Sequence, residues 1–212
     1  MNGFRLNRVL STPLTACLLR LPVTPNMVTT ASLALGLTAG WLFSQGRYAQ
    51  ALAGAACYQL AVVLDNCDGE IARAKKLGSN FGAWFDITAD FITDAALFAG
   101  VALGAFRADA QGPVALFAAL CLSGAVLHLA LVVLEKKRGF GPAAFGSPNP
   151  DQKGRRGVLW DFFDALREGE SSWFVVILAL AGQSIWLLWF GGIYMQILWL
   201  SAVAINFRWL FR

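Results

Sequence analysis

The sequence has a single histidine, few charged residues and no regularly spaced cysteines. Its single histidine, His128, lies deep in an apolar run, which disfavours a zinc site and favours a packed role for this side chain. Only 14% of the 212 residues are charged, and the net charge of +4 is too mild to suggest a nucleic-acid partner. The four cysteines show no metal-binding or redox spacing, so we expect small buried side chains in a reducing compartment.

Apolar residues are abundant instead, at 57% of the chain, and they indicate an all-α integral membrane protein. Hydropathy predicts six transmembrane helices, at residues 28–43, 49–64, 84–105, 113–134, 173–182 and 185–207. We expect the second helix to continue to Arg73 and the third to begin near Gly82. The turn between the last two is predicted either at Gly182-Gln183 or at Gly191-Gly192.

Two segments outside these spans are predicted to lie at the membrane surface. Residues 1–24 precede the first span as an interfacial amphipathic helix, in which Thr12 is the expected N-cap and Pro13 the first helical residue. Arg20 interrupts the apolar stretch, which argues against a cleaved signal peptide. Residues 135–172 form a predicted cytoplasmic loop with a second interfacial helix at 158–167. The chain has no internal repeat and therefore lacks the inverted-repeat signature of a transporter. Residues 1–212 are expected to be one membrane-embedded domain.

Basic residues are distributed unevenly between the loops. If the six spans alternate, all but two of the 17 lysines and arginines lie on one side, and the exceptions are Arg47 and Arg107. Because cytoplasmic loops are enriched in these residues, that side is predicted to be the cytoplasm. The protein is thus expected in the cell (inner) membrane, surrounded by membrane lipids.

Four aspartates stand where the second and third spans reach this cytoplasmic side: Asp65, Asp68, Asp86 and Asp90. Residues three or four apart share a helix face, so they form two carboxylate pairs. Carboxylates beside a membrane core are functional by default, and their oxygens suit hard cations such as Mg²⁺, Mn²⁺ or Ca²⁺. Four of them are enough for two metal ions.

Small residues and an arginine accompany the aspartates. Gly69, Ala72 and Gly82 remove side-chain bulk and leave room for an extended group against the backbone. Arg73 offers a fork of donors suited to phosphate. A substrate that carries a diphosphate, held by two metal ions and an arginine, accounts for all of these features.

The whole pattern, Asp65-x2-Asp68-Gly69-x2-Ala72-Arg73-x8-Gly82-x3-Asp86-x3-Asp90, resembles the signature of the CDP-alcohol phosphotransferase family. The resemblance implies a transferase of phospholipid biosynthesis. It would move a phospho-alcohol or phosphatidyl group from a CDP-linked donor to an alcohol or lipid hydroxyl acceptor and release CMP. It also implies a homodimer and two Mg²⁺ or Mn²⁺ ions.

The resemblance assigns roles to particular residues. It implies that Asp65, Asp68 and Asp86 are metal ligands, and that Asp90 is the catalytic base and an additional ligand. It implies a CDP pocket made by Gly69, Ala72, Arg73 and Gly82, and Asn26 and Thr29 are expected to close this pocket from the first span.

The acceptor and the wider class of function stay open at the level of sequence. Glu70 favours the branch that uses polar, inositol-type CDP donors, and Asp94, Lys75 and Lys76 are candidates for the acceptor site. A divalent-cation transporter would also place carboxylates in membrane helices, but it gives no reason for Arg73. An inactive scaffold of the same fold is the other alternative, and the presence of all four aspartates argues against it.

Overall fold

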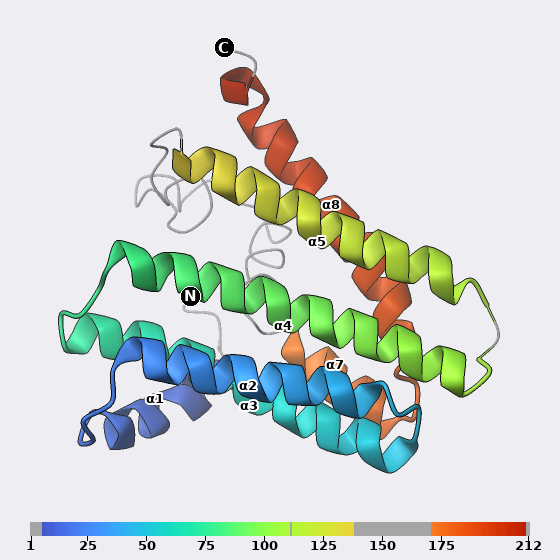
Figure 1. The fold of residues 1–212 in the computed structure, drawn as a ribbon, viewed down its shortest axis with the longest axis horizontal. Coiled ribbons are helices and arrows are strands. Elements are labelled where there is room, and N and C mark those ends of the chain that lie inside the picture. The colour runs from blue at the N-terminus through green and yellow to red at the C-terminus, as the bar shows by residue number, and fades with distance from the viewer. Residues whose placement is uncertain (1–5, 111, 138–170, 211–212) are drawn as a thin grey trace.

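A computed structural model describes residues 6–110, 112–137 and 171–210. These residues form α-helices and no strands, as the sequence predicts. The helices are α1 (Leu6–Leu18), α2 (Pro25–Phe43), α3 (Tyr48–Ala74), α4 (Asn80–Arg107), α5 (Val114–Lys137), α7 (Ser172–Leu180) and α8 (Trp186–Leu210) (Figure 1). The interfacial helix predicted at 158–167 lies outside the described residues.

Two of the described helices are long and apolar enough to cross a membrane. They are α4 and residues Val114–Leu134 of α5, while the apolar stretch Trp186–Leu200 of α8 is shorter. Length and composition therefore support two of the predicted spans in the described part of the chain. The arrangement of six spans stays a prediction.

Capping residues start the two helices that enter the site region. Thr24 precedes α2 and its hydroxyl accepts a hydrogen bond from the Met27 amide at 3.4 Å, with Pro25 in the first helical position. Ser79 precedes α4, and its hydroxyl accepts from the Gly82 amide at 2.9 Å. The helix α3 runs unbroken to Ala74, so the predicted extension past its apolar run is confirmed.

The start of α1 differs from the prediction. The helix begins at Leu6, and Pro13 lies inside it rather than at its first position. Thr12 is likewise helical, and its hydroxyl donates to the carbonyl of Arg8 at 2.7 Å. Tertiary contacts explain the difference, because Asn7 bonds to residues of two other helices and thereby stabilises the turn ahead of the proline.

The turn between the last two helices lies at Gly182. This residue has φ +68°, a conformation that glycine adopts without strain. The alternative position, Gly191-Gly192, is inside α8. There a Cβ on Gly191 would lie 2.4 Å from the ring of Phe98, so this glycine serves close packing.

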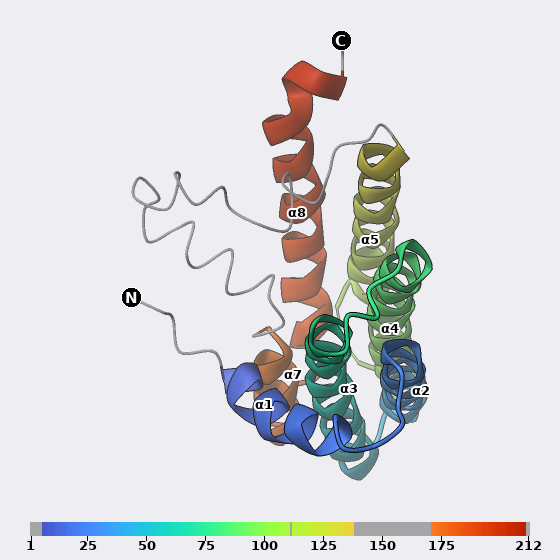
Figure 2. The ribbon, with the colours of Figure 1, turned by 90° about the vertical axis from the view of Figure 1, so that its left-hand side faces the viewer.

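The helix α2 is the shared neighbour of the two helices that carry the aspartates. It packs along both α3 and α4, whose backbones lie farther from each other and which meet through side chains such as Tyr58 and Asp94 (Figure 2). Elsewhere α1 and α7 pack on α3, and α5 packs on α4 and α8. The relative position of the aspartates on α3 and α4 therefore depends on α2.

Glycines let α2 and α4 touch backbone to backbone. A Cβ on Gly100 would lie 2.1 Å from the carbonyl oxygen of Gly40, and one on Gly104 would lie 2.2 Å from that of Phe43. Small residues repeated at this spacing are a common way for membrane helices to approach closely. Neither backbone can yield locally, so an added side chain would push the helices apart.

We predict that Gly100→Ala lowers the free energy of unfolding by about 1–3 kcal/mol, the usual cost of overpacking a tight interface. Gly78→Ala is the control, because a Cβ there meets nothing within 4 Å. Thermal unfolding in detergent, followed by circular dichroism, measures both. Equal midpoints for the two variants would show that the close contact contributes nothing.

Candidate metal centre

Three carboxylates from two helices meet at one point. Asp65 and Asp68 of α3 and Asp86 of α4 each place one oxygen within 4.8 Å of the others. Asp68 is buried and the other two are half-buried. The structure thus brings together three of the four aspartates that the sequence singles out.

A hydroxyl from α2 orients one of the three carboxylates. Buried Thr29 donates a hydrogen bond to Oδ2 of Asp68. A side chain fixed by such a bond presents its other oxygen in a defined direction. Thr29, expected in the pocket, therefore contacts the cluster directly.

Asp90 lies one helical turn beyond Asp86 on α4. Its carboxyl group is within hydrogen-bond distance of that of Asp65, so it adjoins the cluster without belonging to the three-carboxylate group. Among the residues that the structure describes, Asp90 is exposed. A carboxyl group that reaches both the cluster and the surroundings can meet an incoming molecule.

Arg73 and two glycines border the carboxylates. A Cβ on Gly69 would lie 3.4 Å from Nη1 of Arg73, so the guanidinium lies over this glycine. A Cβ on Gly82 would lie 3.2 Å from Oδ1 of Asn26, so the start of α4 adjoins the start of α2. Half-buried Ala72 precedes the arginine in α3. The structure thus brings Asn26 and Gly82 together, and Arg73 and Gly69 together.

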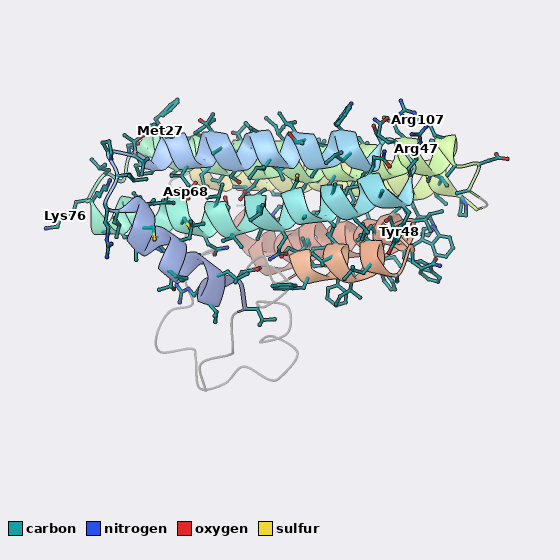
Figure 3. The ribbon with its side chains drawn as sticks, turned by 90° about the horizontal axis from the view of Figure 1, so that it is seen from below. Met27, Arg47, Tyr48, Asp68, Lys76 and Arg107 are labelled. Carbon is teal, nitrogen blue, oxygen red and sulfur yellow. The ribbon has the colours of Figure 1, made fainter. Side chains whose placement is uncertain are left out.

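The three acceptor-site candidates lie outside the cluster. Lys75 donates from Nζ to the carbonyls of Leu21 and Val23, at 2.9 Å each, and so holds the loop between α1 and α2. Lys76 is exposed and lies at the end of the molecule, beyond Asp68 (Figure 3). Asp94 lies one turn past Asp90.

Tyr58 is a site neighbour that the sequence analysis missed. Its buried hydroxyl donates to Oδ1 of Asp94 at 2.9 Å. Tyr58 precedes Asp65 by seven residues, which is two helical turns and therefore the same face of α3. That spacing could have identified it from the sequence.

The side chains present fit a hard divalent cation. The cluster offers carboxylate oxygens only, which are the ligands that Mg²⁺ and Mn²⁺ prefer. His128 and the four cysteines are not members of it. Asp65, Asp68 and Asp86 are the residues that would hold such an ion, with Asp90 beside them.

Comparison with known proteins places this geometry in context. A profile of the CDP-alcohol phosphatidyltransferase family matches residues 22–207. A bifunctional IPC transferase and DIPP synthase of Rubrobacter xylanophilus is 43% identical over 108 residues, which cover 50% of this chain and 24% of that protein. A phosphatidylinositol phosphate synthase of Mycobacterium tuberculosis is 41% identical over 96 residues, covering 43% and 42%. The matched stretches thus span less than half of either relative.

Solved structures extend the similarity over most of the chain. The apo crystal structure of the Mycobacterium tuberculosis phosphatidylinositol phosphate synthase has a TM-score of 0.59 and 25% identity, and covers 91% of this chain and 95% of that one. The same synthase has been solved with manganese and citrate, and with CDP-DAG bound, each at a TM-score of 0.59.

We predict that Asp65→Asn and Asp86→Asn each weaken Mn²⁺ binding by about tenfold or more, because each removes a charged oxygen ligand. Asp109→Asn is the matched control, since Asp109 is exposed beyond the far end of α4. Calorimetric titration of Mn²⁺ into each purified variant measures the affinity. If all three variants bind Mn²⁺ equally well, the cluster is not the metal site.

Proposed function

Because the chain belongs to the CDP-alcohol phosphatidyltransferase family, we propose that it transfers a phosphate-linked alcohol from a CDP-linked donor to a hydroxyl acceptor and releases CMP. The observation that supports this most strongly is the meeting of Asp65, Asp68 and Asp86 beside Arg73. A bound diphosphate needs positively charged groups close to several of its negatively charged oxygens. Divalent metal held by the carboxylates, together with the guanidinium, supplies that charge.

The substrate pair that we propose is a CDP-linked donor and an inositol phosphate acceptor. Support comes from the relatives named phosphatidylinositol phosphate synthase and from the solved synthase that holds CDP-DAG. These point to CDP-diacylglycerol as the donor. The 43% identity to the bifunctional IPC transferase and DIPP synthase, together with Glu70, favours a polar inositol-type donor as the alternative.

The residues of this chain would divide the reaction between them. Two divalent ions held by Asp65, Asp68, Asp86 and Asp90 would neutralise the diphosphate and stabilise negative charge on the leaving CMP. Arg73 binds a phosphate oxygen, with Gly69 and Ala72 leaving space beside it. Asn26 and Gly82, in contact at the starts of α2 and α4, form the opposite side of the CDP pocket.

Proton transfer is the task proposed for Asp90. The acceptor oxygen forms a bond to the phosphorus that carries the donor's alcohol, and the bond from this phosphorus to the bridging oxygen breaks. Its electron pair leaves with CMP, while the hydroxyl proton passes to the Asp90 carboxylate. Asp90 suits this role because it contacts Asp65 and is exposed to an incoming acceptor.

Several larger features belong to the same proposal. We place the protein in the cell (inner) membrane as six spans and a homodimer, with the site facing the cytoplasm, where most lysines and arginines lie. Asp94, Lys75 and Lys76 remain the candidates for acceptor contacts. A cation transporter is disfavoured because it gives no reason for the guanidinium of Arg73 over Gly69 beside the carboxylates.

CMP release tests the function directly. We expect CMP from purified protein given inositol phosphate, Mg²⁺ or Mn²⁺, and either CDP-diacylglycerol or CDP-inositol, with the productive donor identifying the branch. CDP-choline and CDP-ethanolamine are the comparison donors. Excess EDTA should abolish the reaction. CMP release that is undiminished in EDTA would contradict the metal-dependent mechanism.

A second prediction separates proton transfer from metal binding. We expect Asp90→Asn to lower turnover by about 10²–10⁴-fold, the usual contribution of a general base, with a much smaller change in donor affinity. Asp65→Asn should weaken donor and metal binding together. Calorimetry of donor binding and turnover assays on both variants make the comparison. If Asp90→Asn loses donor binding as completely as Asp65→Asn, Asp90 is a metal ligand and the base is another residue.

A further inference from the structure

The helix α1 presents three polar residues to the rest of the protein, while several of its apolar residues face outward. Asn7, Ser11 and Thr15 are 1%, 0% and 6% exposed, and they follow one another at intervals of four along a single helix face. Leu6 and Val9, in contrast, are 44% and 56% exposed. Hydrogen bonds therefore help to dock this helix, together with the apolar packing of Leu14 and Leu18 against the cluster of Val28, Cys67 and Ile71.

Glu70 of α3 is the centre of the docking contacts. Ser11 donates from Oγ to Oε1 of Glu70 at 3.1 Å, and Thr15 donates from Oγ1 to Oε2 at 2.6 Å. Both oxygens of one carboxylate are thus held by hydroxyls one helical turn apart. Near the start of α1, Asn7 accepts a hydrogen bond from Gln59 of α3 at 2.6 Å. This contact lies nearer the start of α3 than Glu70 does.

These contacts lie behind the metal cluster. Glu70 follows Asp68 by two residues, which turns its side chain about 200° away from the carboxylate face. On the surface of α3, Cys67 lies between the two aspartates and Glu70. It is 0% exposed, and its Sγ lies 3.6 Å from the carbonyl oxygen of Ser11. The helix α1 therefore covers the back of the turn that carries the ligands.

A support at this position has a physical purpose. Three carboxylates within 4.8 Å repel one another, and this repulsion favours a rotation of α3 that would turn Asp65 and Asp68 away from Asp86. The hydroxyls on Glu70 hold α3 from the side opposite the cluster. Lys75 adds a second attachment through its bonds to the α1–α2 loop.

We propose that Glu70 is a positioning residue: held by Ser11 and Thr15, it fixes the rotation of α3 and keeps Asp65 and Asp68 directed at Asp86. Glu70 touches neither substrate nor metal in this role. The inference deepens the proposed function and rests on it only in treating the cluster as a metal site.

Metal binding and cysteine reactivity test the proposal without an activity assay. We expect Glu70→Ala and the double variant Ser11→Ala/Thr15→Ala each to weaken Mn²⁺ binding by about tenfold, the effect typical of residues that orient metal ligands. Glu70→Gln, which keeps a hydrogen-bonding side chain of the same length, should restore most of the affinity. Alkylation of Cys67, measured by peptide mass spectrometry, should accelerate in the same variants as α1 loosens.

Two comparisons decide the outcome. Combining all three alanine substitutions should weaken binding no more than Glu70→Ala alone, since all of them break one contact. Thr12→Ala is the control, because Thr12 is exposed on α1 and bonds within its own helix. Unchanged Mn²⁺ affinity in Glu70→Ala, or fully additive losses, would overturn the proposal. If Glu70→Ala does not fold, Ser11→Ala and Thr15→Ala singly make the same comparison.

The two levels of inference fail differently. If the unaltered protein binds Mn²⁺ but releases no CMP from any donor, the proposed function is wrong while the role of Glu70 can still be measured. If CMP release is metal-dependent and Glu70→Ala binds Mn²⁺ normally, only the positioning role is wrong.

Discussion

Backbone contact between α2 and α4 is the constraint on which the rest of the site depends. Because α2 packs along both α3 and α4, whose own backbones lie farther apart, α2 fixes their separation. The contact is possible only because Gly40 and Gly100 carry no side chains. From the same helix, Thr29 orients Asp68 and Asn26 reaches the start of α4 at Gly82. One helix thus positions ligands from both of its neighbours.

Charge explains why the site needs support from more than one side. Carboxylates gathered this closely repel one another until a cation or a shared proton joins them. Packing on α2 resists this repulsion from one side, and the hydroxyls of α1 on Glu70 resist it from another. The carboxylates and Arg73 then offer charges of both signs to a diphosphate and its metal ions. The packing thus holds the carboxylates close together before metal ions and substrate bind.

Local spacing in the sequence was sufficient to predict the two aspartate pairs, whereas their meeting in one cluster depends on the packing of α3 and α4 on α2. Each pair, Asp65 with Asp68 and Asp86 with Asp90, is close in sequence. Helical periodicity alone therefore puts each pair on one face. The predicted start of α1 was wrong. Capping preferences favoured a helix that begins at Pro13, whereas contacts to distant helices determine where that helix begins. Helical spacing places Tyr58 on the face of Asp65 and aligns the polar residues of α1, but their partners, Asp94 and Glu70, are far away in sequence and no local pattern specifies them.

The central claim is that metal held by these aspartates binds the diphosphate shared by every CDP-linked donor. Calorimetric titration of cytidine 5′-diphosphate into the purified protein, with Mn²⁺ and again in excess EDTA, tests it most directly, because this probe does not depend on which alcohol the donor carries. The account predicts saturable binding with Mn²⁺ and none in EDTA. Equal binding under both conditions would contradict it.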